Sequence, residues 1–148
     1  MDGVLCNFQK VYHSVNLPNT PKKFRHCVAH LKIFENLEWM PSGRKLLEFL
    51  DTLGVEIQIL SSRGTHDDVI GGEGIRQKEL WLDKNGITYK RNFVKIGIDK
   101  RNYSNKGTIL IDDTPKVVES FNSGAGIALL YEDAKFKEMK IELLKHFT

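Results

Sequence analysis

From residue 42 onward, short apolar segments alternate with segments of helical spacing, and this alternation constrains the fold more than any other feature. The segments expected to be strands are 55–60, 93–96, 108–111 and 126–131. Each is apolar over most of its length, as strands are when both faces of a sheet are covered. Strands of this kind, separated by helices, predict an α/β fold with a parallel sheet between two helical layers.

Cap and turn residues set the expected boundaries of these helices. Ser42 is expected to cap the first helix of this region with its side chain, and Gly54 to end it. The glycines within 71–74 predict a polar, glycine-rich loop ahead of the next helix. Pro115 suits the first turn of a third helix, because its missing N–H has no partner there in any case.

Residues 8–41 do not follow the alternation. They are predicted to form a small helical insert, a cap that lies over the strand ends, while 1–7 and 42–148 form the core domain. The insert is rich in histidine and aromatic residues. Its aromatic side chains either pack in the core or stack on a substrate base, and the candidates for stacking are Phe8, Tyr12 and Trp39.

Composition narrows the possible partners. A chain of 148 residues predicts one domain, and two cysteines, Cys6 and Cys27, do not make a disulfide framework. No apolar run approaches the ~18 residues of a membrane span. The net charge of +3 comes from dispersed lysines and arginines. We therefore expect a cytoplasmic protein with a small anionic substrate, and neither a membrane nor a nucleic acid as partner; the oligomeric state stays open.

Polar residues follow two of the predicted strands, where α/β proteins bind ligands. Asp112 and Asp113 follow 108–111. Adjacent carboxylates repel each other unless a cation offsets their charge, so the pair suggests a Mg²⁺ site. The alternative is that Asp113 caps the next helix and Asp112 faces solvent.

A second polar pair, Ser61 and Ser62, follows 55–60. These serines are either turn residues or donors of hydroxyl and backbone N–H hydrogen bonds to a phosphate. Lys100 and Lys106 precede the acidic pair, and one of them could neutralise charge during phosphoryl transfer.

The order of these motifs resembles the haloacid dehalogenase (HAD) superfamily of phosphatases. The chain has an Asp-Gly motif within 1–8, a strand ending in Ser61, then Lys100, then a strand ending in the acidic pair at 112–113. The segments 38–41 and 100–103 further resemble small phage and bacterial proteins of the 5′(3′)-deoxyribonucleotidase type. The resemblance implies a HAD-like, Rossmann-like three-layer fold with a small helical cap.

The resemblance also implies a role for each motif residue. Asp2 would be the general acid and base, with its backbone carbonyl on Mg²⁺. Ser61 would hydrogen-bond a phosphoryl oxygen, and Lys100, preferred to Lys106, would hold nucleophile and phosphate together. Asp112 and Asp113 would supply metal ligands directly or through water. The implied activity is Mg²⁺-dependent hydrolysis of a small phosphorylated metabolite, such as a deoxynucleoside monophosphate.

One departure from the family pattern is large. The nucleophilic aspartate of the superfamily stands two places before Asp2, ahead of Met1, and the strand before it is missing too. Either the recorded start is an internal methionine of a longer gene, or the protein binds a phosphate or nucleotide without hydrolysis. In both cases this chain is expected to have little or no phosphatase activity, and its open sheet edges to invite pairing with another chain.

Two other classes fit less well. Receiver domains combine an acidic pair, a hydroxyl residue and a lysine, but their acidic pair follows the first strand, whereas here it comes last. A zinc module would draw on His26, Cys27 and His30 with Cys6 and His13. No second ligand pair with familiar zinc spacing accompanies them.

Overall fold

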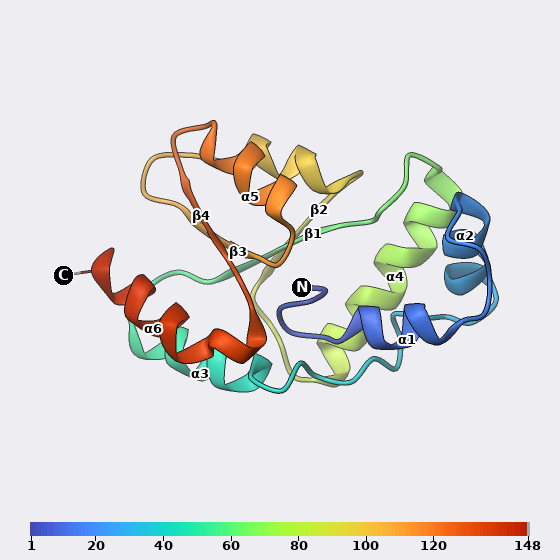
Figure 1. Ribbon diagram of the computed structural model, residues 1–148, viewed down its shortest axis with the longest axis horizontal. Helices are drawn as coiled ribbons and strands as arrows, with labels where there is room; N and C mark the ends of the chain where they lie inside the picture. Colours follow the sequence, from blue (N-terminus) through green and yellow to red (C-terminus); the bar gives the residue numbers. More distant parts are fainter. Residues whose placement is uncertain (148) are drawn as a thin grey trace.

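The computed structural model describes residues 1–147, in which helices alternate with parallel strands (Figure 1). The α-helices are α1 (Phe8–Ser14), α2 (Pro21–Ala29), α3 (Gly43–Thr52), α4 (Asp68–Lys84), α5 (Pro115–Asn122) and α6 (Phe136–Lys145). The strands are β1 (Gln58–Ser62), β2 (Lys90–Val94), β3 (Ile109–Asp112) and β4 (Ile127–Leu130), and two 3₁₀ helices are η1 (Gly97–Tyr103) and η2 (Asp133–Lys135). The predicted α/β class is confirmed.

The strands form two parallel pairs instead of the single sheet we expected. β1 pairs with β2, with Gln58 opposite Lys90, and β3 pairs with β4, with Ile109 opposite Ile127. No hydrogen-bonded ladder joins β1 to β3 among the described residues. In Figure 1 the strands of both pairs lie in the middle part of the molecule.

Most predicted elements exist, with shifted ends. β1 begins three residues later than the predicted 55–60 and runs through Ser61 and Ser62, so these serines are the last residues of the strand and not a turn after it. Ser42 does stand at the N-cap of α3, but its side chain makes no capping hydrogen bond. Its backbone N–H instead donates to Asp133 Oδ1 at 2.9 Å, which ties α3 to η2.

The predicted glycine-rich loop at 71–74 is wrong, because α4 already begins at Asp68. The Asp67 side chain accepts hydrogen bonds from the N–H groups of Val69 and Ile70, which is a strong N-cap. A Cβ at Gly71 would crowd the Arg63 side chain, so this glycine allows a close approach of helix and strand end. Tertiary packing and the cap outweigh the low helix propensity of glycine here.

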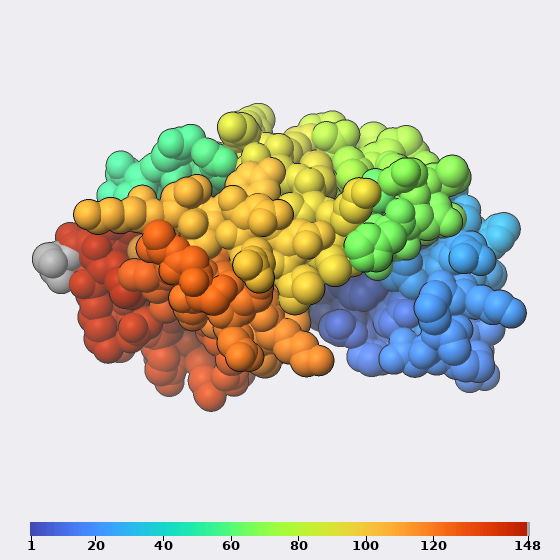
Figure 2. Space-filling view, turned by 90° about the horizontal axis from the view of Figure 1, so that it is seen from above, coloured from blue at the N-terminus to red at the C-terminus, as the bar shows by residue number. Residues whose placement is uncertain are grey.

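Residues 8–41 contain two short helices, α1 and α2, and α4 holds this segment in place. The buried Gln77 side chain accepts from the N–H of Phe34 at 3.2 Å and donates to the carbonyl of Val28 at 2.8 Å. Trp81 Nε1 donates to the carbonyl of Leu37 at 2.8 Å. α1 and α2 therefore lie beside α4 at one end of the molecule, with α6 at the other (Figures 1 and 2).

The core has two parts. The larger cluster joins the N-terminal segment, the insert, α4 and α6, and it includes Cys27, Phe34, Trp81 and Leu143. A smaller cluster joins β3, β4 and α5 through Leu110, Val117, Phe121 and Ala128. Both cysteines are buried and unpaired.

Candidate active site

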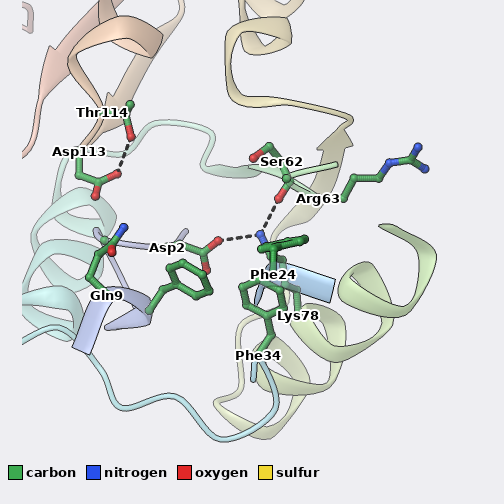
Figure 3. A pocket seen from close by; sticks show the side chains of 12 residues that line it. Asp2, Gln9, Phe24, Phe34, Ser62, Arg63, Lys78, Asp113 and Thr114 are labelled. Atoms are coloured by element: carbon green, nitrogen blue, oxygen red, sulfur yellow. Dashed lines mark hydrogen bonds and ion pairs between the residues drawn. The ribbon is translucent and has the colours of Figure 1, made fainter. Parts of the chain in front are cut away.

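A small cavity lies where the N-terminal segment, the end of β1, α4 and the start of α5 meet (Figure 3). Its volume is about 180 Å³. The polar lining comes from Asp2, Gln9, Ser62, Arg63, Lys78, Asp113 and Thr114, and the apolar lining from Phe8, Phe24 and Phe34. The cavity thus brings together residues from Asp2 to Thr114 at the carboxyl ends of parallel strands, where such folds bind ligands.

The centre of the cavity is an ion pair between Asp2 and Lys78. Lys78 Nζ lies 2.7 Å from Asp2 Oδ2 and 3.0 Å from the hydroxyl of Ser61, and only 1% of its side chain is exposed. Burial alone would raise the pKa of Asp2, but the ammonium group of Lys78 and the nearby amino terminus outweigh it, so the pKa lies below its usual range. Asp2 is therefore an ionised carboxylate in this state.

Lys100 forms a second buried ion pair, away from the cavity. Its ammonium group lies 2.5 Å from Asp112 Oδ2, with both side chains less than a tenth exposed. The other oxygen of Asp112 accepts from the backbone N–H of Thr114 at 3.0 Å. Lys106, the alternative to Lys100, is exposed. Lys100 thus neutralises the first residue of the acidic pair and does not line the cavity.

Of the acidic pair, Asp113 is the residue that lines the cavity. Burial and the neighbouring carboxylate of Asp112 raise its pKa above the usual range. Its side chain accepts a long hydrogen bond, 3.3 Å, from the hydroxyl of Thr114. Gly3, with φ +73°, lies directly against it, and a Cβ at that position would overlap the carboxylate. A second cation near Asp113 would lower the free energy of this arrangement.

The donor set of the cavity suits Mg²⁺, which prefers carboxylate and carbonyl oxygens together with water. Asp113 supplies a carboxylate with no basic partner, and the Asp2 carbonyl accepts none of the backbone hydrogen bonds of the described residues. Three carboxylate side chains do not converge, however. Within residues 1–147, no three His, Cys, Asp or Glu side chains form a group that could hold a metal ion.

That finding also removes support for the zinc interpretation. The ring centroids of His26 and His30 lie 5.2 Å apart on α2. Cys27, which lies between them in the sequence, is fully buried. Neither histidine is joined by further ligands in the described part of the chain. The alternative, that His26 and His30 belong to the polar face of α2, fits these side chains better.

Aromatic rings form one wall of the cavity. Phe8 stacks on Phe34 with ring centroids 5.3 Å apart, and Phe24 meets Phe34 edge-on at 6.3 Å. Of the three aromatic residues singled out from the sequence, only Phe8 lines the cavity. Tyr12 stacks behind Phe8, and Trp39 packs on Trp81.

No local pattern in the sequence points to Lys78, the most buried basic residue of the site. It lies in the middle of a helix among charged residues, where a solvated lysine is the ordinary expectation, and its partner Asp2 is 76 residues away. Arg63 was also missed. Its guanidinium group pairs with Asp68 at 2.6 Å and points away from Lys78 (Figure 3).

The parallel α/β fold, with carboxylates and a serine at the carboxyl ends of its strands, is consistent with the HAD-like class. The chain belongs to the family described as 5′ nucleotidase, deoxy (Pyrimidine), cytosolic type C protein, whose profile matches residues 6–141. The predicted superfamily is confirmed by this match. The chain matches no curated protein and no solved structure. Among residues 1–147, no helix combines the length and apolar character needed to cross a membrane.

Proposed function

We propose that the cavity around Asp2, Lys78 and Asp113 is the phosphate site of a Mg²⁺-dependent nucleotidase that acts on a (deoxy)nucleoside monophosphate in the cytoplasm. The observation that carries the proposal is the buried Lys78, which joins the Asp-Gly motif to the serine at the end of β1. Family membership over 6–141 supports a nucleotide as substrate. The phenylalanine wall offers an apolar surface for a base or a sugar.

Lys78 and Asp2 would act as a coupled pair. An incoming phosphoryl group competes for the ammonium group of Lys78, because charge-assisted hydrogen bonds to phosphate are strong. As Lys78 turns toward phosphate, the pKa of Asp2 rises and its carboxylate would take up a proton from solvent. It would then donate this proton to the leaving oxygen, and the carboxylate so re-formed would accept a proton from the attacking water. Ser61 and the backbone and hydroxyl of Ser62 would hold phosphoryl oxygens.

Asp113 and the Asp2 carbonyl would hold the metal ion, which supplies charge neutralisation at the phosphoryl group. Asp112, fixed by Lys100, would act through water or by orienting its neighbour. Lys100 thereby takes a positioning role in the proposal, in place of the direct phosphate contact implied by the resemblance.

The chain as given has no carboxylate at the position two places before Asp2. We therefore propose that it hydrolyses its substrate slowly or not at all. A second candidate function follows from the same residues: a nucleotide-binding protein without catalysis, for which the complete Lys78–Asp2–Ser61 cluster is enough.

Phosphate release separates the two candidates. The chain is assayed with pyrimidine deoxynucleoside 5′-monophosphates and Mg²⁺, beside a version in which an apolar strand ending in Asp is fused ahead of Met1. We expect release only from the fusion, and loss of that release when the fused Asp is replaced by Asn. A folded fusion that binds the nucleotide but releases no phosphate would refute the nucleotidase and leave the binding protein.

A further inference from the structure

The Asp2 carboxylate has a different hydrogen-bond donor at each of its two oxygens. Oδ2 lies 2.7 Å from Lys78 Nζ, whereas Oδ1 accepts from the thiol of Cys6, whose sulfur is 3.2 Å away. The proposed function gives Lys78 a role and leaves the thiol of Cys6 unused. Because the side chain of Cys6 is fully buried, its thiol has no water to donate to, and Asp2 is its partner.

The backbone around the Asp-Gly motif fixes the place of Cys6. The N–H of Gly3 donates to the Cys6 carbonyl at 2.8 Å, and the N–H of Cys6 donates to the Met1 carbonyl at 3.3 Å. The residues on either side of Cys6 form backbone hydrogen bonds with the segment 38–40. The Cβ atom from which the thiol reaches Asp2 is therefore held from both sides.

The proton of this contact belongs to the sulfur. Asp2 is ionised, and an ionised carboxylate only accepts hydrogen bonds. Burial and the negative charge of Asp2 raise the pKa of the Cys6 thiol well above its usual range. The thiol thus donates to a charged oxygen, and such hydrogen bonds are roughly twice as strong as those between neutral groups.

We infer that Cys6 is a positioning residue for Asp2, because its thiol holds Oδ1 and thereby keeps Oδ2 directed at Lys78 and the cavity (Figure 3). The inference rests on the proposed function, in which Asp2 is the proton donor and Lys78 is drawn toward the phosphoryl group. When Lys78 leaves Oδ2, Cys6 is the side-chain donor that remains on the carboxylate among the described residues.

This arrangement matters because proton transfer depends on the orientation of the donor group. A carboxylate held only by Lys78 would be free to rotate at the moment when Lys78 turns toward the phosphate. With Oδ1 held by Cys6, the side chain keeps its orientation and Oδ2 is the oxygen left free in the cavity. A side chain whose rotamer is fixed by a neighbouring hydrogen bond is what a preorganised site requires.

Infrared spectroscopy of the folded chain tests the hydrogen bond, because the S–H stretch absorbs where other protein groups do not. The chain has two cysteines, both buried, and Cys6→Ala and Cys27→Ala assign one thiol band each. We expect the Cys6 band at lower wavenumber than the Cys27 band. Asp2→Asn should shift the Cys6 band to higher wavenumber and leave the Cys27 band in place, since a neutral amide oxygen is a weaker acceptor than a carboxylate.

Nuclear magnetic resonance of Lys78→Met tests the positioning, because this variant imitates the state in which Lys78 has left Asp2. The three-bond couplings between Hα and the Hβ protons of Asp2 are each large or small for a single rotamer, and rotation averages them to intermediate values. We expect single-rotamer couplings in Lys78→Met and averaged couplings when Cys6→Ala is added. Cys6→Ser in its place should restore the single rotamer, because the hydroxyl is also a donor, and Cys27→Ala should cause no averaging.

Two results would overturn the inference. The first is a Cys6 band at the same wavenumber as the Cys27 band or above it. The second is a set of Asp2 couplings that is already averaged in folded Lys78→Met, or that Cys6→Ala does not change. If Lys78→Met does not fold, the infrared comparison decides by itself. Neither measurement uses a nucleotide, so a chain that fails to bind thymidine 5′-monophosphate would refute the proposed function by a separate result.

Discussion

The pKa values of the two carboxyl groups that line the cavity are shifted in opposite directions. The pKa of Asp2 is lowered, although burial opposes the effect, because Lys78 and the amino terminus are close. The pKa of Asp113 is raised, because it is buried and adjacent to Asp112. A lowered pKa stabilises the fold at neutral pH, and a raised carboxyl pKa destabilises it there. The site therefore contains one carboxylate that already has its cation and one that does not.

Because the Asp113 carboxylate has no cation beside it, we expect Asp113→Asn to raise the free energy of unfolding by an amount that depends on pH. The native state holds the Asp113 proton to higher pH than the unfolded chain does, so its contribution to stability falls as pH rises from about 4. The variant should be more stable than the parent at pH 7, by on the order of 1 kcal/mol, with the gain shrinking toward pH 4. Urea unfolding at both pH values measures this, and a gain that grows toward pH 4 would refute the assignment.

Gly3 has a requirement that no other residue type meets. Its φ of +73° and its contact with Asp113 leave no room for a Cβ. Gly3→Ala should lower the free energy of unfolding by about 1–3 kcal/mol. Gly72→Ala is the matched control, since that helical glycine has open space around it and should raise stability by about 0.5–1 kcal/mol. Equal effects of the two substitutions in thermal melts would contradict the packing described for Gly3.

Among the helices and strands, α4 connects the cavity to residues 8–41. It supplies Lys78 to the cavity and anchors the insert through Gln77 and Trp81, which are on the same side of the helix. The sequence signals for this helix were misleading, because three glycines suggested a loop. The cap at Asp67 was a usable signal, but the close approach at Gly71 depends on Arg63 and is not visible in local sequence.

Because Gln77 holds residues 8–41 against α4, Gln77→Ala should lower the local stability of this segment. This change leaves the N–H of Phe34 and the carbonyl of Val28 buried without partners, which costs about 1–3 kcal/mol. We expect faster hydrogen exchange and proteolysis within 8–41 than in β1 or β3. Glu79→Ala, on the exposed side of α4, should change neither. An equal increase in hydrogen exchange along the whole chain would show that Gln77 does not hold residues 8–41 in particular.

At the scale of the whole molecule, the sequence predicted the class and the strands better than their assembly. Apolar β-branched segments located all four strands to within a few residues, because burial on both faces leaves a clear pattern. That pattern does not determine which edges meet, so the split between β2–β1 and β3–β4 was not foreseen in detail.

For the site, the sequence predicted several single residues but not the pairings between them. Asp2, Ser62 and Asp113 line the cavity. Ser62 ends a strand and Asp113 follows one, and such positions can be recognised in a sequence, whereas Asp2 was identified through the family resemblance. The pairing of Lys100 with Asp112, and of Lys78 with Asp2, depends on contacts across 12 and 76 residues. Contacts of that kind are decided by tertiary packing and leave no local pattern.

If Lys78 makes this cavity a phosphate site, removal of its charge must weaken nucleotide binding. Calorimetric titration of the chain with thymidine 5′-monophosphate in Mg²⁺ tests it directly, beside Lys78→Met and the control Lys84→Met, an exposed lysine of the same helix. Circular dichroism establishes that each variant is folded. We predict that the chain and Lys84→Met bind with equal affinity and that Lys78→Met binds at least about tenfold more weakly, as the loss of a charge-assisted hydrogen bond requires. Equal affinity of folded Lys78→Met, or no binding by the unaltered chain, would contradict the account.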